Sequence, residues 1–370
     1  MKTILFIFGT RPEALKLIPL INEFKKYGNK FNTKVCITSQ HQEMLWQVLQ
    51  FFDTEPDYNL NIMLPNQTLF DLTSNGLKKI EKVLNEVKPD LVIVQGDTTS
   101  TFIGALAAFY NKIPVAHIEA GLRSGNKYSP FPEEINRKLV SQIADFHFAP
   151  TLLAYENLLN EKRDNNVFIV GNTVIDALFM TLDKIKNINF EEKFSFLYSD
   201  SKLILVTGHR RESFGEPFKN ICNALLKIAK DNNDVQIVYP VHLNPNVINP
   251  VSSILSGQWN ISLIKPLNYP EFVWLMNKSY LILTDSGGVQ EEAPSLGKPV
   301  LVMREVTERT EGIKAGTAKL IGTSTEMIYN EVTNLLTNKN EYDKMANATN
   351  PYGDGNSSAK IVEIIKNMLL

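Results

Sequence analysis

Apolar and polar positions follow two different periods along this chain. Short runs rich in Val, Ile and Leu recur, and between them lie longer segments whose apolar residues are spaced as on one face of a helix. Strands that are apolar throughout are typical of parallel sheets, which helices cover on both faces. The first half therefore predicts a doubly wound α/β fold. Its expected strands are residues 4–8, 34–38, 91–94 and 115–118, and its expected helices are 15–26, 69–87 and 99–110.

The second half repeats this alternation without a fixed-period sequence repeat. It predicts a second, similar fold, so that two Rossmann-like domains face each other across a cleft. A short strand ends in Gly171-Asn172 before a helical run at 174–185, and we place the boundary there. We expect domains at 1–170 and 171–351, with a C-terminal helix at 352–370 that packs back on the first domain. The expected strands of the second series are residues 168–170, 203–207, 236–240, 262–264, 280–284 and 300–303.

Composition narrows the class of protein. A chain of 370 residues exceeds the size of one hydrophobic core, and 44% hydrophobic with 21% charged residues is typical of a globular protein. Lys and Arg number 38 against 40 Asp and Glu, so no overall field favours nucleic acid or an anionic membrane as a partner. No run approaches the roughly 20 apolar residues that span a bilayer. The cysteines, Cys36 and Cys222, are expected as buried free thiols, which suits a cytoplasmic protein.

The first candidate turn, Gly9-Thr10-Arg11-Pro12-Glu13, follows the first expected strand. Pro12 fits the first position of a helix, where free backbone N–H groups and the helix dipole attract anions. Arg11 can add a bidentate guanidinium. The alternative is an ordinary helix cap with a surface Arg. The turn lacks the three-glycine dinucleotide fingerprint, so it does not indicate a nicotinamide enzyme.

Acidic residues follow the next expected strands. Asp97 lies in QGDTT, Glu119 in HIEAGLR, and Glu133 in PFPEEINR at an expected helix start. Carboxylates with unequal environments at one edge of a sheet can move protons on sugar carbons and stabilise an oxocarbenium ion. Asp97 can instead be an N-cap, and one of Glu133 and Glu134 is expected to be only a helix-start charge. For His117 the favoured interpretation is a histidine in the core of a strand.

Two turns of the second half suit phosphate. Gly208-His209-Arg210-Arg211 after a strand predicts an anion site, the alternative being a solvated basic turn. In Asp285-Ser286-Gly287-Gly288 two glycines between strand and helix would let the backbone approach a pyrophosphate, and a Glu one turn onward could bind ribose hydroxyls. Residues 304–311 add further polar groups. The five histidines lack metal-ligand spacing, so we expect no metal, and Arg and helix termini must neutralise the diphosphate.

The segments GTRPE, QGDTT, HIEAGLRS, PFPEEINR, TGHRRE, PVHLNP and DSGGVQEEAPSLGKPV occur in this order between residue 3 and about residue 355. Together they resemble the signature series of the non-hydrolysing UDP-N-acetylglucosamine 2-epimerases. The resemblance implies a two-domain fold of the glycosyltransferase GT-B type, usually a homodimer, with UDP-N-acetylglucosamine and UDP as ligands and no cofactor.

The resemblance also implies roles for individual residues. Phe272 would stack near the uracil, and some bacterial members bind a second UDP-N-acetylglucosamine as an activator. Asn66 departs from activator-dependent members, which often carry an Arg there. The implied catalytic residues are Asp97, Glu119, Glu133 and His209; the UDP and sugar contacts are Arg11, Lys16, Phe272, Ser286, Gly287, Gly288, Glu292 and Arg309; and the activator contacts are Gln40, Glu43, Arg210 and His242.

The expected reaction is epimerisation of UDP-N-acetylglucosamine to UDP-N-acetylmannosamine, by elimination of UDP to 2-acetamidoglucal and re-addition, which supplies N-acetylmannosamine units for surface polysaccharide. One carboxylate would take the proton, a second would stabilise the cation, and His209 would hold the departing diphosphate. The sequence leaves open which carboxylate is acid and which is base. A hydrolysing epimerase, a glycosyltransferase of the same fold and a non-catalytic sugar-nucleotide sensor are the alternatives.

Overall fold

The computed structural model describes residues 1–39, 42–63 and 67–370. They form two compact units. The first unit comprises Met1–Ala177 together with Tyr352–Leu370, and the second comprises Leu178–Pro351.

The first unit contains one parallel sheet with the strand order β3-β2-β1-β4-β5-β6-β7. The central strands β1 and β4 consist almost wholly of buried residues, as the continuous apolar runs predict. The strands are β1 (Lys2–Phe8), β2 (Phe31–Ile37), β3 (Tyr58–Asn59), β4 (Leu91–Gln95), β5 (Val115–Ile118), β6 (Phe146–Ala149) and β7 (Val167–Ile169).

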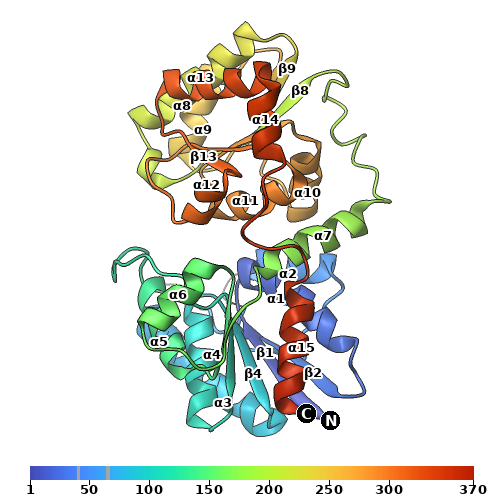
Figure 1. The fold of residues 1–370 in the computed structure, drawn as a ribbon, viewed down its shortest axis with the longest axis vertical. Coiled ribbons are helices and arrows are strands. Elements are labelled where there is room, and N and C mark those ends of the chain that lie inside the picture. The colour runs from blue at the N-terminus through green and yellow to red at the C-terminus, as the bar shows by residue number, and fades with distance from the viewer. Residues whose placement is uncertain (40–41, 64–66) are drawn as a thin grey trace. The chain divides into compact units, whose positions relative to one another are not determined.

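Helices cover both faces of this sheet (Figure 1). The chain moves in one direction from β1 to β3 and in the other from β4 to β7, and right-handed crossovers then place the two groups of helices on opposite faces. Thus α1 packs against α2 and α15, while α4 packs against α3 and α5. The helices are α1 (Arg11–Lys25), α2 (Gln42–Phe51), α3 (Leu69–Val87), α4 (Thr99–Tyr110), α5 (Glu133–Ile143), α6 (Leu152–Asn160) and α15 (Ser357–Leu369).

Three strands were not predicted from the sequence, namely β3, β6 and β13. Strand β7 pairs with β6 in the first sheet, as the expected domain 1–170 implies, although the order of strands groups residues 168–170 with the second series. It lies at the sheet edge and is only half-buried. Strand β6 has His147 between two phenylalanines, and β3 has only two residues. Short or interrupted runs carry little periodic signal.

The second unit has a parallel sheet with the order β10-β9-β8-β11-β12-β13. Helix α8 packs against α9 and α13, and α10 packs against the short helix η2. The strands are β8 (Lys202–Thr207), β9 (Val235–Pro240), β10 (Ile261–Ile264), β11 (Leu281–Thr284), β12 (Val300–Val302) and β13 (Ala318–Leu320). The helices are η1 (Arg211–Ser213), α8 (Glu216–Asp231), α9 (Pro245–Leu255), α10 (Tyr269–Lys278), α11 (Gly287–Glu292), η2 (Ala293–Leu296), α12 (Thr310–Ala315), α13 (Thr325–Thr337) and α14 (Lys339–Ala346).

The division between the units falls within α7 (Thr173–Ile185), at residues 177 and 178, and not at residue 170 as expected from the sequence. The start of α7 belongs to the first unit because Val174 and Ile175 form a buried cluster with Tyr352. Asp176 accepts hydrogen bonds from the backbone N–H groups of Ser357 (3.3 Å) and Ser358 (2.7 Å) at the start of α15. A loop-like Gly-Asn pair therefore precedes a helical turn that is still part of the first core.

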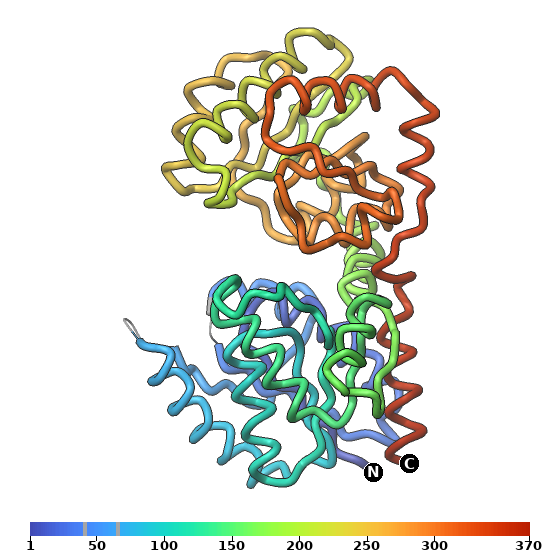
Figure 2. Tube along the Cα trace, turned by 60° about the vertical axis from the view of Figure 1, so that its left-hand side comes forward, coloured from blue at the N-terminus to red at the C-terminus, as the bar shows by residue number. Residues whose placement is uncertain are grey.

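Helix α15 lies along α1, and both chain termini lie near each other in the first unit (Figures 1 and 2). Within the described ranges no helix is long and apolar enough to cross a membrane. Cys36 and Cys222 are buried free thiols, as predicted, and burial raises the pKa of each thiol to about 12.

In both units the strand order reverses at one place, between β1 and β4 and between β8 and β11. Turns that follow such strands lead to helices on opposite faces of the sheet, and in open α/β sheets ligands bind beside these turns. The predicted motifs GTRPE and QGDTT follow β1 and β4, and TGHRRE and DSGG follow β8 and β11. The topology therefore places the candidate residues where this fold class binds ligands.

We predict that Gly9→Ala lowers the free energy of unfolding by about 1–3 kcal/mol, because overpacking of a core costs that much. A Cβ atom at Gly9 would overlap with the hydroxyl groups of Thr38 and Ser100, which are hydrogen-bonded to each other at 2.7 Å. Gly28→Ala is the matched control, since its Cβ would only approach the Lys25 carbonyl at 3.5 Å. Urea unfolding of both variants measures the difference, and equal midpoints for the two would contradict this account of the turn.

Candidate functional site

Glu13 connects the turns that follow β1 and β4. Its Oε2 accepts hydrogen bonds from the backbone N–H groups of Gly9 (2.9 Å) and Thr10 (2.7 Å). Its Oε1 accepts from the hydroxyls of Thr98 (2.7 Å) and Thr101 (2.9 Å) at the start of α4. Burial raises the pKa of the Glu13 carboxyl, while these hydrogen bonds oppose the rise. One buried side chain thus holds two of the predicted site turns together.

This arrangement changes the interpretation of the GTRPE turn. The N–H groups of Gly9 and Thr10, which precede the helix, are occupied by Glu13. They are therefore not among the backbone donors that this turn offers to an anion, and the Arg11 side chain lies half-buried at the first position of α1. Sequence reasoning missed Glu13, although a Thr three residues before a Glu at a helix start is the pattern of a capping box.

Glu119 follows β5 and lies in a buried, charged environment. Lys16 on α1 donates to both carboxylate oxygens at 2.6 Å, and the Gln95 side-chain amide also donates to Oε2. The backbone of Glu119 has a φ of +63°, in the left-handed region that a non-glycine residue rarely adopts. Such local strain is typical of residues whose side chain the surrounding structure orients. Lys16, named only by resemblance, is thereby a direct partner of Glu119.

Asp97 follows β4 and pairs with Arg137 on α5. The distances from its Oδ2 are 2.9 Å to Nε and 2.6 Å to Nη2 of Arg137, and Asn136 Nδ2 donates to the Asp97 carbonyl at 2.9 Å. The Asp97 side chain keeps 26% of its surface exposed. It is therefore not an N-cap of α4, a role that Thr98 fills through its hydroxyl.

The adjacent Glu133 and Glu134 have different environments. Glu134 is fully buried and accepts from the N–H groups of Ser124 (2.9 Å) and Gly125 (3.2 Å) and from Arg137 Nη1 (3.2 Å). Burial opposes ionisation, but these donors lower the pKa of Glu134. Glu133 Oε2 is buried and has no hydrogen-bond partner in the described part of the chain. Glu134 therefore shapes the loop, and Glu133 retains an oxygen for another group.

His117 is a histidine of the strand core. Its side chain is buried, and Nε2 lies 2.8 Å from the Gly96 carbonyl oxygen. Burial lowers its pKa to about 4, and His147 on the neighbouring strand β6 has its pKa lowered to about 4 for the same reason. Both imidazoles are thus neutral at pH 7 and act as packing groups.

In the second unit, Asp285 after β11 holds the turn that follows β8. Its Oδ2 accepts from the backbone N–H groups of His209 (2.6 Å) and Arg210 (2.7 Å). The His209 ring keeps 46% of its side-chain surface exposed and stacks on the ring of His242, with centroids 5.5 Å apart. The turn is therefore fixed by a buried carboxylate, and its imidazole remains accessible.

The two glycines of the DSGG turn have different surroundings. A Cβ at Gly287 would lie 3.2 Å from Cζ of Arg309, so glycine allows the guanidinium to lie over the start of α11. Arg309 also donates to Glu291 Oε1 from Nε and Nη2, both at 2.8 Å. A Cβ at Gly288 would meet nothing closer than 3.8 Å, at the Glu292 carboxylate. Space beside Gly288 suits a ligand that approaches the backbone closely.

Glu292 is oriented by a residue that sequence reasoning missed. It is buried, and the Tyr269 hydroxyl donates to its Oε1. Tyr269 begins α10 and stands three positions before Phe272, so the two rings lie on the same face of that helix. The spacing of Tyr269 and Phe272 was the sequence signal that could have identified Tyr269.

A separate cluster of charges follows β12. Buried Arg304 binds Glu212 (2.6 Å) and Glu308 (2.9 Å). Burial by itself would raise the pKa of Glu308, but the bond to Arg304 outweighs this and lowers that pKa to about 2.

The candidate activator residues belong to different units and their joint role stays a prediction. Glu43 is exposed in the first turn of α2 in the first unit, whereas Arg210 and His242 lie in the second. Gln40 and Asn66 lie outside the described residues. Across residues 1–39, 42–63 and 67–370, no group of three or more His, Cys, Asp or Glu side chains could hold a metal ion.

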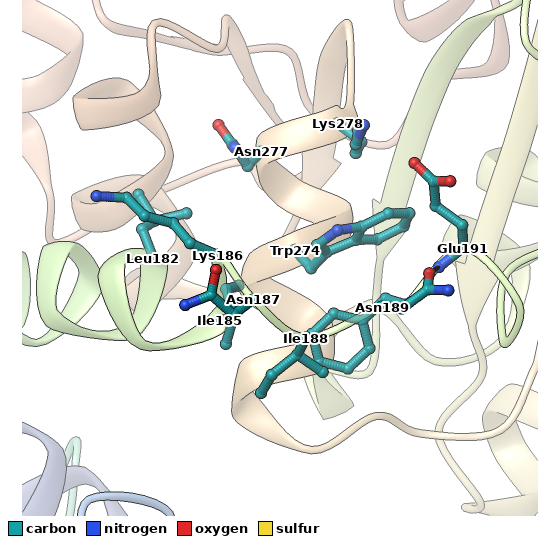
Figure 3. Close-up of a pocket in the computed structure, with 11 residues that line it drawn as sticks. Leu182, Ile185, Lys186, Asn187, Ile188, Asn189, Glu191, Trp274, Asn277 and Lys278 are labelled. Atoms are coloured by element: carbon teal, nitrogen blue, oxygen red, sulfur yellow. Dashed lines mark hydrogen bonds between the residues drawn. The ribbon is translucent and has the colours of Figure 1, made fainter.

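A cavity of about 450 Å³ lies elsewhere in the second unit, between α10 and the segment that follows α7 (Figure 3). Its aromatic wall is Trp274, which stacks on Phe194 with ring centroids 5.1 Å apart. Trp274 is two positions from Phe272, so the two side chains point to different sides of α10. None of the candidate site residues lines this cavity.

Comparisons with known proteins agree on one family. The family model described as UDP-N-acetylglucosamine 2-epimerase matches residues 23–366. The UDP-N-acetylglucosamine 2-epimerase of Salmonella typhimurium is 55% identical over 369 residues, which cover 98% of each chain. The crystal structure of the Neisseria meningitidis UDP-GlcNAc 2-epimerase, bound to UDP-GlcNAc, has 52% identity and a TM-score of 0.90, and the match covers 99% of this chain and 100% of the other.

A more distant likeness concerns the fold alone. Acinetobacter baumannii MurG is 15% identical, with a TM-score of 0.62 over the full length of both chains. The two-domain Rossmann-like fold predicted from the sequence is thereby confirmed.

We predict that the stability of the protein falls as the pH falls from about 6.5 to about 4, partly because of His117. Between these pH values the unfolded chain binds a proton at His117 and the folded chain does not. The free energy of unfolding therefore falls by about 1.4 kcal/mol for each pH unit of acidification. His117→Gln should reduce the stability difference between pH 7.5 and pH 5 by about 2 kcal/mol. Urea unfolding at both pH values tests this, and an unchanged difference would show that His117 is not neutral in the folded protein.

Proposed function

This chain belongs to the UDP-N-acetylglucosamine 2-epimerase family and is an isomerase, and we propose that it interconverts UDP-N-acetylglucosamine and UDP-N-acetylmannosamine without net hydrolysis. The single observation that carries the proposal is the group of three carboxylates, Asp97, Glu119 and Glu133, at the turns of the first sheet. A protein that only binds a sugar nucleotide has no need of them.

The chemistry requires elimination before inversion. Carbon 2 of the sugar has no adjacent carbonyl, so its proton becomes acidic only as the bond from carbon 1 to the UDP oxygen breaks. The electron pair of that bond leaves with UDP, the carbon 2 proton goes to a carboxylate, and the C–H electrons form the double bond of 2-acetamidoglucal. A proton then adds to carbon 2 from the opposite face, and UDP returns to carbon 1. The protein must therefore move protons and stabilise an oxocarbenium ion.

We assign proton transfer first to Glu133, because its buried Oε2 has no hydrogen-bond partner among the described residues. Asp97 lies against Arg137 and Glu119 against Lys16, and carboxylates that face a cation in this way suit stabilisation of an oxocarbenium ion. A second proton donor is needed on the other face of the sugar. Lys16 donates to both oxygens of Glu119, and its ammonium group would supply this proton through that carboxylate.

The second unit would hold UDP. Gly287, Gly288 and Ser286 at the start of α11, with the Arg309 guanidinium, provide donors for a diphosphate. Glu292, oriented by Tyr269, would accept hydrogen bonds from ribose hydroxyls, and Phe272 would contact the uracil. His209, with an accessible ring, would donate to the departing phosphate, and Arg11 would add positive charge.

Further features of the proposal come from the family. We propose that the protein is a homodimer in the cytoplasm, where buried thiols remain reduced, and that it supplies N-acetylmannosamine units for surface polysaccharide. A second UDP-N-acetylglucosamine at Glu43, Arg210 and His242 would be an activator. The alternatives are a hydrolysing epimerase or a glycosyltransferase on the same fold, and a sensor without catalysis.

The first test is incubation with UDP-N-acetylglucosamine in deuterated water, followed by proton NMR. We expect UDP-N-acetylmannosamine with deuterium at carbon 2 and the sugar still joined to UDP at equilibrium, because the carbon 2 proton exchanges with solvent during elimination. Free N-acetylmannosamine together with stoichiometric UDP would mean a hydrolysing enzyme. If the carbon 2 proton does not exchange for deuterium at all, the protein is not an epimerase of this kind, and a glycosyltransferase or a sensor is the better interpretation.

The second test separates the adjacent glutamates. Glu133→Gln should lower kcat by about 10²–10⁴, the usual contribution of a proton-transfer group, with stability unchanged within about 0.5 kcal/mol. Glu134→Gln should lower stability by about 1–3 kcal/mol, because the donors of Ser124, Gly125 and Arg137 lose a charged acceptor. Urea unfolding and steady-state kinetics of both variants measure this. Full activity in Glu133→Gln would remove Glu133 from the mechanism.

A further inference from the structure

The carboxylate of Asp285 holds the turn after β8 with only one of its two oxygens. The side chain is 3% exposed, and its Oδ2 accepts from the N–H groups of His209 and Arg210. Its Oδ1 has no hydrogen-bond partner within the described chain and lies 3.4 Å from Nδ1 of the His209 ring. A buried carboxylate oxygen without a donor is costly unless a nearby group supplies one. The nearest candidate is the His209 imidazole.

We propose that Asp285 is a positioning residue for His209: it accepts the Nδ1–H of the ring and so fixes the tautomer. This inference rests on the proposed function, in which His209 faces the departing diphosphate. With Nδ1–H held by Asp285, Nε2 is the nitrogen that faces the ligand. When Nε2 also carries a proton, its N–H can donate to the phosphate oxygen that gains the electrons of the broken bond, and the Asp285 carboxylate lies behind the ring on the Nδ1 side.

The groups around His209 are consistent with a need for such a carboxylate. The His242 ring is stacked on it at an angle of 15°, and Arg210 is its neighbour in the chain. Positive charge from either group would oppose a positive imidazole. Asp285 is the buried negative group in contact with both the backbone and the ring of His209.

Asp176 provides a matched control for a purely structural role. It too is buried and accepts from two successive backbone N–H groups, those of Ser357 and Ser358. It belongs to the first unit and caps α15, and it is not among the proposed site residues. Asp285→Asn and Asp176→Asn therefore remove the same charge from the same kind of backbone contact, but only the first faces an imidazole.

The substitution Asp285→Asn changes the ring contact specifically. The two backbone donors require the amide oxygen at the position of Oδ2, so the NH₂ group must face Nδ1 of His209. Nδ1 then has to accept, and the proton moves to Nε2. The backbone contact is kept while the tautomer is reversed and the carboxylate beside the ring is removed.

The experiment reads the tautomer by long-range ¹H–¹⁵N NMR of the full-length protein labelled with ¹⁵N-histidine, at alkaline pH where imidazoles are neutral. The chain has five histidines, and the signals of His209 are identified as those that disappear from the spectrum of His209→Gln. We expect Nδ1–H in the wild type and Nε2–H in Asp285→Asn. Asp176→Asn should leave the wild-type tautomer unchanged.

Kinetics gives the second readout. In Asp285→Asn we expect kcat to fall by about 10²–10³, the usual effect of removing one preorganised electrostatic contact, because the neutral Nε2–H that remains no longer has a carboxylate behind the ring. KM for UDP-N-acetylglucosamine should change less than about threefold. Asp176→Asn should keep kcat within about twofold.

An Nε2–H tautomer in the wild type would overturn the inference, and so would an unchanged kcat in a folded Asp285→Asn. The wild-type tautomer decides the question even if Asp285→Asn does not fold. If the wild type shows no exchange at carbon 2 but has the Nδ1–H tautomer, the proposed function fails while the pairing of Asp285 with His209 stands.

Discussion

Four buried carboxylates each accept hydrogen bonds from two successive backbone N–H groups, and the turns of this protein depend on these contacts. Glu13 binds Gly9 and Thr10, Glu134 binds Ser124 and Gly125, Asp176 binds Ser357 and Ser358, and Asp285 binds His209 and Arg210. The ends of strands and the starts of helices leave N–H groups that regular secondary structure no longer satisfies. A buried carboxylate accepts from these N–H groups and fixes the turn in one conformation.

This use of carboxylates separates the supporting acids of the first unit from those proposed to act on the sugar. Glu13 and Glu134 face backbone donors, whereas Asp97 and Glu119 face the cations Arg137 and Lys16. Carboxylates bound by backbone N–H groups have few remaining lone pairs and a fixed position, so they serve as supports. In the proposed function, the carboxylates paired with a cation at a strand end stabilise the positive charge of the transition state.

The second unit applies the same principle to anion binding. In the proposed function its phosphate-facing turns carry Arg309 and His209, and each of these side chains has a buried acid beside it, Glu291 and Asp285 respectively. Positive groups that are held in place before the ligand arrives need little reorganisation when negative charge develops on it.

The sequence by itself determined the α/β class, the two halves and the position of the candidate site turns at the ends of strands, because burial on both faces of a parallel strand leaves a continuous apolar run and polar residues then stand out at its end. It could not distinguish Glu133 from Glu134, or identify Glu13 or Tyr269 as supports. Those facts depend on which donors approach each side chain. The N–H groups that orient Asp285 are 75 and 76 positions away in sequence, and only the folding of two strands side by side brings them within hydrogen-bond distance.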